Sequence, residues 1–105
     1  MAQRLDGARF DASALPAGRT AVLFFADWCG YCQRFTPLFQ RIPDAWIVDV
    51  SDEDLPVWET YDITVVPTVI MFQDGDPVKK WAGALGGEHV EQVEDALRQA
   101  AHENG

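Results

Sequence analysis

The chain has 105 residues and a formal net charge of −9, because 17 Asp and Glu oppose 8 Lys and Arg. Its length is close to the modal size of one domain, and its two cysteines are too few for a disulfide-dense scaffold. The negative charge disfavours nucleic acid and anionic membrane surfaces as partners, and no apolar run suits a signal peptide or a membrane-spanning helix. We therefore expect a single globular domain over residues 1–105, located in the cytoplasm.

The first part of the chain predicts a strand followed by a helix. Its beginning is weakly patterned, although Asp11 is a suitable cap for a short helical turn. Residues 21–26 form a continuous apolar run, which is typical of a strand covered on both faces. From residue 29 to residue 42 the apolar side chains recur at helical spacing, with Pro37 inside the segment and Pro43 directly after it.

The remainder of the chain predicts three further strands and two further helices. Strands are expected at 46–50, 69–72 and 78–82, helices at 54–61 and around 90–100, and a tight turn at Asp74-Gly75. This order of elements predicts an α/β fold with a mixed sheet. The two cysteines lie where the first core strand is followed by its helix.

The segment Cys29-Gly30-Tyr31-Cys32 places one thiol at the start of the predicted helix and the other one turn later. Unpaired backbone N–H groups and the positive end of the helix dipole stabilise a thiolate at that start, so Cys29 is the predicted nucleophile. Cys32 lies on the apolar face and is the predicted resolving thiol. Attack by Cys29 on a disulfide gives a mixed disulfide, which Cys32 resolves by forming the Cys29–Cys32 bond.

Two other interpretations of the cysteine pair are open. Half of a zinc site has the same spacing, but zinc takes four ligands, and the sequence offers only His89 and His102 as further candidates. The second interpretation is that the spacing of the two cysteines is incidental and that the pair carries no chemistry. We expect both histidines to lie on the surface, and we expect no metal and no other cofactor.

Several motifs, found in order along the chain, carry a family resemblance. From residue 21 to the last helix the sequence resembles thioredoxins, and the matching residues are Ala26-Asp27-Trp28-Cys29-Gly30-Tyr31-Cys32, Pro37, Tyr61-Asp62-Ile63, Val66-Pro67-Thr68, Phe72, Gly75 and Gly83. The resemblance implies the thioredoxin fold, a mixed central sheet of four to five strands flanked by helices on both faces. It also implies thiol–disulfide oxidoreductase activity.

The resemblance further implies a substrate site around the cysteine pair. Pro67 is expected to be a cis proline that faces the pair and blocks metal entry, and the backbone of Val66 is expected to bind an extended peptide. The residues expected to contact substrate are Trp28, Gly30, Tyr31, Val66, Pro67, Gly83 and Ala84. Without the resemblance, the sequence indicates only that a proline is suited to the start of a strand.

The expected function is the reduction of protein disulfides in the cytoplasm. The protein is expected to be a monomer that receives electrons from a reductase or another thiol donor. One alternative is a disulfide oxidase or isomerase outside the cytoplasm. Another is a redox-silent module that holds a peptide or protein partner in the groove.

Three features depart from the family pattern. Leu23 stands where thioredoxins usually have a buried aspartate, so Cys32 must lose its proton to solvent or to the leaving thiolate of the substrate. The lysine that accompanies this aspartate is also absent, since the matching strand reads Ile47-Val48-Asp49. Gly30-Tyr31 replaces glycine-proline, which leaves the redox direction open, and the segment from Cys32 to Trp46 is shorter than usual.

The excess negative charge is confined to one stretch of the chain. Residues 42–78 hold nine Asp and Glu and no Lys or Arg, whereas the rest of the chain holds eight acidic and eight basic residues. The run from Asp49 to Asp54 follows a core strand, at the sheet edge expected to bear the cysteines. We expect one of two roles for these acidic residues. They form either a rim that partly offsets the stabilisation of the Cys29 thiolate by the helix dipole, or a solvated face that only keeps the protein soluble.

Overall fold

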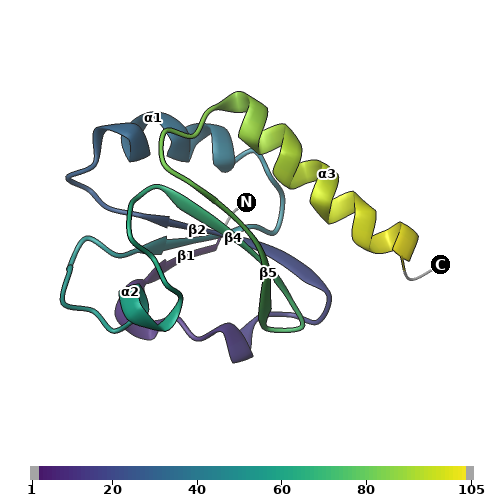
Figure 1. The fold of residues 1–105 in the computed structure, drawn as a ribbon, viewed down its shortest axis with the longest axis horizontal. Coiled ribbons are helices and arrows are strands. Elements are labelled where there is room, and N and C mark those ends of the chain that lie inside the picture. Colours follow the sequence, from purple (N-terminus) through teal and green to yellow (C-terminus); the bar gives the residue numbers. More distant parts are fainter. Residues whose placement is uncertain (1–2, 104–105) are drawn as a thin grey trace.

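The computed structural model describes residues 3–103, in which five strands form one sheet in the order β1-β3-β2-β4-β5 (Figure 1). The strands are β1 (Gln3–Asp6), β2 (Arg19–Phe25), β3 (Trp46–Asp49), β4 (Thr68–Gln73) and β5 (Asp76–Ala82), and the α-helices are α1 (Gly30–Phe39), α2 (Val57–Thr60) and α3 (Gly87–Glu103). The expected α/β fold with a mixed sheet is confirmed.

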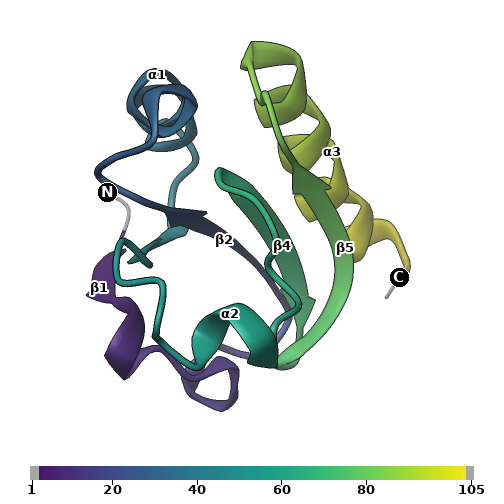
Figure 2. The same ribbon diagram turned by 60° about the vertical axis from the view of Figure 1, so that its left-hand side comes forward.

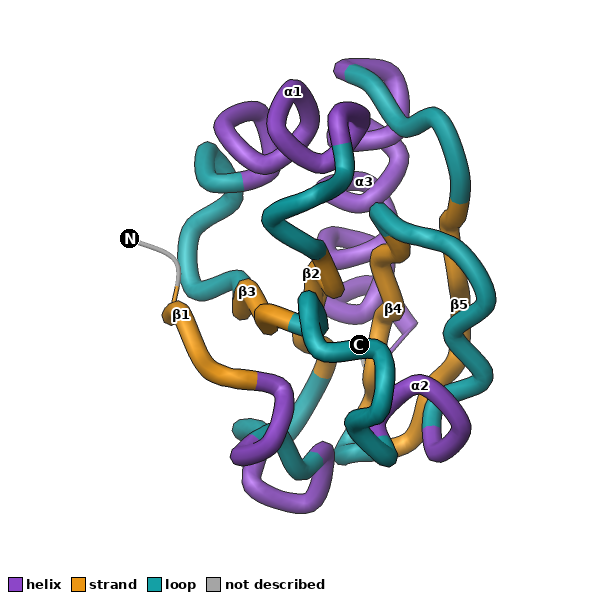
Figure 3. The backbone as a smooth tube through the Cα atoms, turned by 90° about the vertical axis from the view of Figure 1, so that its left-hand side faces the viewer, coloured by secondary structure: helices purple, strands orange, loops and turns teal. Residues whose placement is uncertain are grey.

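Strand directions in the sheet follow from the connections between strands. β1 and β2 both pair in parallel with β3, and α1 makes the crossover from β2 to β3 that a parallel pair requires. β4 runs antiparallel to both β2 and β5. The carboxyl ends of β2 and β3 therefore reach the same edge of the sheet, and Figure 3 looks onto the loops that leave this edge.

Helices cover both faces of the sheet, as expected. α1 and α3 lie on one face and α2 lies on the other (Figure 2). Side chains of β2 alternate between two buried clusters: Leu23 and Phe25 belong to the cluster under α1 and α3, and Val22 and Phe24 belong to the cluster on the opposite face. The first cluster also contains both cysteines, so the cysteine pair is anchored in the core.

Strand β1 is an element that the sequence did not predict. Its four residues are exposed except for a half-buried Leu5, so they lack the apolar pattern that marks a core strand. What makes this segment a strand is its parallel pairing with β3, whose edge it covers.

Both helices that were predicted in the middle of the chain are shorter than expected. α1 ends at Phe39 instead of residue 42, because Pro43 disfavours helical backbone before it and the N–H groups of Arg41 and Ile42 bond to carbonyls three residues back. α2 begins at Val57 instead of residue 54, because the Asp52 carboxylate accepts the N–H of residue 54 in a local turn.

The turn between β4 and β5 has the geometry that its sequence predicts. Asp74 and Gly75 have φ angles of 53° and 87°, and such left-handed pairs match the twist of a two-residue hairpin.

Within the described residues, no helix has both the length and the apolar character needed to cross a membrane.

Candidate active site

Cys29 occupies the N-cap of α1, in the loop that follows β2. Its backbone is extended, with φ −98° and ψ 115°, and the helix begins at the next residue. The Sγ atom accepts a hydrogen bond from the Cys32 backbone N–H at 3.2 Å and donates one to the Val66 carbonyl oxygen at 3.4 Å. The sulfur thus takes the place of the capping oxygen found at many helix starts, next to unpaired backbone N–H groups.

Cys32 lies one turn further along α1 and is the more buried of the two free thiols, at 1% exposed against 7% for Cys29. Burial, assisted by hydrogen bonding with Cys29, raises the pKa of Cys32 from its ordinary value of 9.0 to about 12. Cys32 therefore holds its proton at neutral pH. The Cys29 sulfur, by contrast, already has an N–H donor directed at it.

The sheet on the Cys32 side is apolar. Leu23 and Ile47 are paired directly across β2 and β3, and both belong to the buried cluster that contains Cys32. Among the residues that the structure describes, the buried polar side chains other than the cysteines are Thr20, Thr36 and Thr68, none of which is a carboxylate or an amine. The positions of Leu23 and Ile47 therefore offer no group that accepts the Cys32 proton.

The loop before β4 faces the cysteine pair, as the family resemblance implies. The Val66–Pro67 peptide bond is cis, and the carbonyl that accepts the Cys29 hydrogen bond is that of Val66. The Thr68 hydroxyl donates to the Val65 carbonyl at 2.7 Å, and the Gly83 N–H donates to the Pro67 carbonyl at 3.1 Å. These bonds hold the loop in place and bring Gly83 against Pro67.

Exposed apolar side chains gather beside Cys29. Trp28 and Tyr31 are each 54% exposed, and Val65 is 46% exposed. Sequence reasoning did not select Val65, although it stands directly before Val66 and Pro67. The Arg34 guanidinium, also not selected, lies 5.1 Å from the centre of the Tyr31 ring, and the three-residue spacing on one helix is its only sequence signal.

The acidic loop after β3 adjoins the same group of side chains. The Trp28 indole N–H donates to the Ser51 carbonyl at 2.9 Å, and the Asp27 backbone N–H donates to the Ser51 hydroxyl at 2.8 Å. Asp52, Glu53 and Asp54 follow directly and are exposed. The acidic run therefore lies next to the residues that precede Cys29, while its effect on Cys29 stays a prediction.

Metal ligands do not assemble around the cysteine pair. Within the described residues, no three His, Cys, Asp or Glu side chains are grouped so that they could hold a metal ion. His89 is half-buried, and its Nδ1 accepts the Gly86 N–H at 2.9 Å, so it reaches the surface only in part and is less solvated than expected. The prediction for His102 concerns a side chain outside the described residues.

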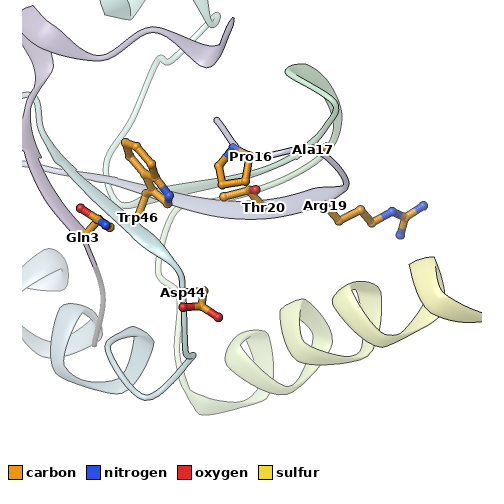
Figure 4. Close-up of a pocket in the computed structure, with 7 residues that line it drawn as sticks. All are labelled: Gln3, Pro16, Ala17, Arg19, Thr20, Asp44 and Trp46. Carbon is orange, nitrogen blue, oxygen red and sulfur yellow. The ribbon is translucent and has the colours of Figure 1, made fainter. Parts of the chain in front are cut away.

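A cleft lies at the opposite end of the strands, where β1, β2 and β3 begin (Figure 4). Its volume is about 330 Å³, and it is lined by Gln3, Pro16, Ala17, Arg19, Thr20, Asp44 and Trp46. None of these residues is a thiol or an imidazole. The Arg19 guanidinium is already bonded to the Ala96 carbonyl and the Gln73 side chain. We therefore take the cysteine pair, and not this cleft, as the candidate active site.

Comparisons with known sequences place the chain in one family. Residues 2–96 match the family model for thioredoxin. Thioredoxin from Chlamydia pneumoniae is 34% identical over 95 residues, which cover 86% of this chain and 92% of that protein. Thioredoxin from Staphylococcus aureus is 32% identical over 99 residues, which cover 88% of this chain and 93% of that protein.

Comparisons with solved structures show a shared fold. The thioredoxin of Malassezia sympodialis superposes with a TM-score of 0.72 at 23% identity, covering 94% of this chain and 90% of that one. A mutant thioredoxin from Halobacterium salinarum gives a TM-score of 0.73 at 23% identity, covering 93% and 90% of the two chains.

Proposed function

Because the chain belongs to the thioredoxin family of thiol–disulfide oxidoreductases, we propose that it reduces disulfide bonds in protein substrates, with Cys29 as nucleophile and Cys32 as resolving thiol. The observation that carries the proposal is the position of the Cys29 sulfur between the Cys32 N–H and the Val66 carbonyl oxygen. There, a donor that stabilises a thiolate stands beside a backbone segment suited to an extended peptide.

The proposed reaction takes two exchange steps. In the first, the Cys29 thiolate attacks one sulfur of the substrate disulfide; the Cys29–substrate bond forms, the substrate S–S bond breaks, and the other sulfur leaves as a thiolate. In the second, Cys32 loses its proton and attacks the Cys29 sulfur, forming the Cys29–Cys32 bond and releasing the second substrate thiolate. The substrate gains two electrons, the dithiol loses two, and the released thiolates take up protons.

The substrate is proposed to bind across the rim formed by Trp28, Gly30, Tyr31, Val66, Pro67, Gly83 and Ala84. The exposed rings of Trp28 and Tyr31 supply apolar contact beside the nucleophile. A Cβ atom added at Gly30 or Gly83 would meet nothing within 4 Å, so a peptide backbone can approach both positions closely. Val66 offers its carbonyl once Cys29 is ionised and no longer donates to it.

The proposed setting follows the sequence-based expectations. The whole chain acts as one domain and as a monomer in the cytoplasm, without a prosthetic group. Electrons lost to the substrate are replaced by a reductase or by another thiol donor, which reduces the Cys29–Cys32 disulfide. The family membership supports both the protein-disulfide substrate and the need for such a donor.

The reduction potential of the Cys29–Cys32 couple tests the direction of the reaction. The exposed Trp28 next to Cys29 provides a fluorescence signal for titration in dithiothreitol or glutathione buffers. A potential near about −270 mV supports a reductase, whereas one of about −180 mV or higher supports an oxidase or isomerase. Failure to form the intramolecular disulfide would contradict both.

A further inference from the structure

Cys32 borders a cleft that is separate from the rim around Cys29. The cleft has a volume of about 250 Å³ and is lined by Arg4, Phe25, Ala26, Asp27, Cys32, Gln33 and Thr36. Neither Cys29 nor Val66 is among these residues, so this opening is distinct from the proposed peptide groove. It lies between α1 and strand β1, and Cys32 is the cysteine of the pair that lines it.

One row of residues across the sheet leads from the core to this cleft. Leu23 on β2 is paired with Ile47 on β3, and Ile47 is paired with Arg4 on β1. Directly paired residues point to the same face, which here is the face of the cluster that contains Cys32. Two members of the row are apolar, and the charge stands at the third, on the edge strand.

The Arg4 guanidinium is held at the cleft by an aromatic ring. Its central carbon lies 4.8 Å from the centre of the Phe25 ring, and Phe25 forms part of the same cleft wall. The other charged residue of the lining is Asp27, which is exposed at the mouth. Arg4 is therefore the cation among the residues that line the cleft together with Cys32.

From this placement we propose that Arg4 is a positioning residue for the resolving step, which rests on the function proposed above. Its guanidinium stabilises the thiolate that Cys32 forms as it attacks the mixed disulfide, and the cleft lets the proton leave to solvent. In this step the Cys32 S–H proton passes to solvent, the Cys32–Cys29 bond forms, and the Cys29–substrate bond breaks. The electron pair of the broken bond leaves on the substrate thiolate. A cation that stabilises the product of ionisation thus replaces a base that accepts the proton.

The two steps can be timed separately with dithiodipyridine, a neutral disulfide, mixed with excess reduced protein. Attack by Cys29 releases one thiopyridone, and closure by Cys32 releases the second. We expect Arg4→Gln to slow the second phase by up to about fivefold at low salt and to leave the first unchanged, because one exposed charge contributes at most about 1 kcal/mol. High salt should shrink the difference.

Three variants separate this role from others. Arg9→Gln, which removes an exposed charge nearby on the chain, should match the wild type in both phases. Arg4→Lys should restore most of the second-phase rate, because it keeps the charge. Asp27→Asn should leave the second phase unchanged or faster, because it removes an anion from the cleft.

The proposal is overturned if Arg4→Gln leaves the second phase at the wild-type rate or slows both phases equally. It is also overturned if Asp27→Asn slows the second phase, since Asp27 would then be the proton acceptor. Failure of the proposed function has a different signature, in which the wild type itself releases no second thiopyridone or reduces no protein disulfide.

Discussion

The two sides of the cysteine pair are built from different kinds of residue. On the side of Cys29, Trp28, Tyr31 and Val65 are exposed, and the sulfur bonds to the backbone of a distant loop. On the side of Cys32, Leu23 and other buried apolar residues enclose a thiol whose pKa is raised to about 12. Two identical side chains three positions apart therefore become chemically different.

The contrast shows that the helix start and the core act on the two thiols in opposite directions. Backbone N–H groups stabilise an anion at the N-cap, whereas burial among apolar groups one turn later favours the neutral form. In the proposed mechanism, the first thiol attacks the substrate, and the second stays neutral until the mixed disulfide has formed beside it.

Replacing either cysteine should have the largest effect on disulfide reduction. Cys29→Ser is expected to lower the rate of insulin reduction by about a thousandfold or more, because no nucleophile remains. Cys32→Ser keeps the first step and should accumulate a mixed disulfide with substrate, seen by mass spectrometry. A redox-silent binding module would show no turnover in the wild type and an unchanged affinity for an oxidised peptide after Cys29→Ser.

A carboxylate at position 23 would add an ionisable group to the apolar cluster that contains Cys32. Leu23→Asp is expected to lower the free energy of unfolding by about 3 kcal/mol, because an unpaired polar group replaces a fully buried side chain. The same variant should speed the second thiopyridone phase, since the carboxylate can accept the Cys32 proton. Leu23→Asn is the matched control without a base; equal acceleration by both variants would contradict this explanation.

Alkaline pH should lower the stability of the reduced protein, because the Cys32 thiol is buried. The folded thiol holds its proton up to about 12, while an unfolded chain loses it above about 9, so the free energy of unfolding falls as pH rises between these values. Below a pH of about 9, Cys32 causes no loss of stability. Above it, the free energy of unfolding falls by at most about 1.4 kcal/mol per pH unit. Urea titrations of wild type and Cys32→Ala compare the slopes, and identical slopes would show that Cys32 is not the cause.

Removing the exposed ring of Trp28 should have a smaller effect, on substrate binding beside Cys29. Trp28→Ala is expected to raise the KM for a disulfide peptide about threefold to tenfold, with little change in the unfolding transition, because apolar contact is lost from an exposed position. Val78→Ala is the matched control, since Val78 is 51% exposed but lies on β5. Equal KM changes in the two variants would exclude a specific contact at Trp28.

Neutralising the acidic loop should have the smallest effect. Replacing Asp52, Glu53 and Asp54 by their amides is expected to raise the rate of Cys29 alkylation at neutral pH and low salt by about twofold at most, because exposed charges are strongly screened. The same replacement at exposed Asp44, Asp76 and Glu91 removes an equal charge elsewhere. An unchanged alkylation rate, or the same change in both triple variants, would show that the acidic loop is only a solvated face.

Much of this fold could be read from local signals. The apolar run of β2, the helical spacing after Cys29 and the Asp74-Gly75 turn each depend on residues close together in the sequence. β1 was missed because its exposed residues carry no such pattern, and its strand conformation depends on pairing with β3. The boundaries of α1 and α2 were missed because turn hydrogen bonds compete with the helix at their ends.

The sequence by itself predicted most elements of the fold and different roles for the two thiols, because helix capping and the helix dipole act within one turn of the chain. Only the tertiary structure decided what surrounds those thiols. It joined Cys29 to the Val66 carbonyl across 37 positions, buried Cys32 over Leu23, and set Arg4 in register with Ile47. These arrangements depend on strand register and packing between distant segments, which no local pattern specifies.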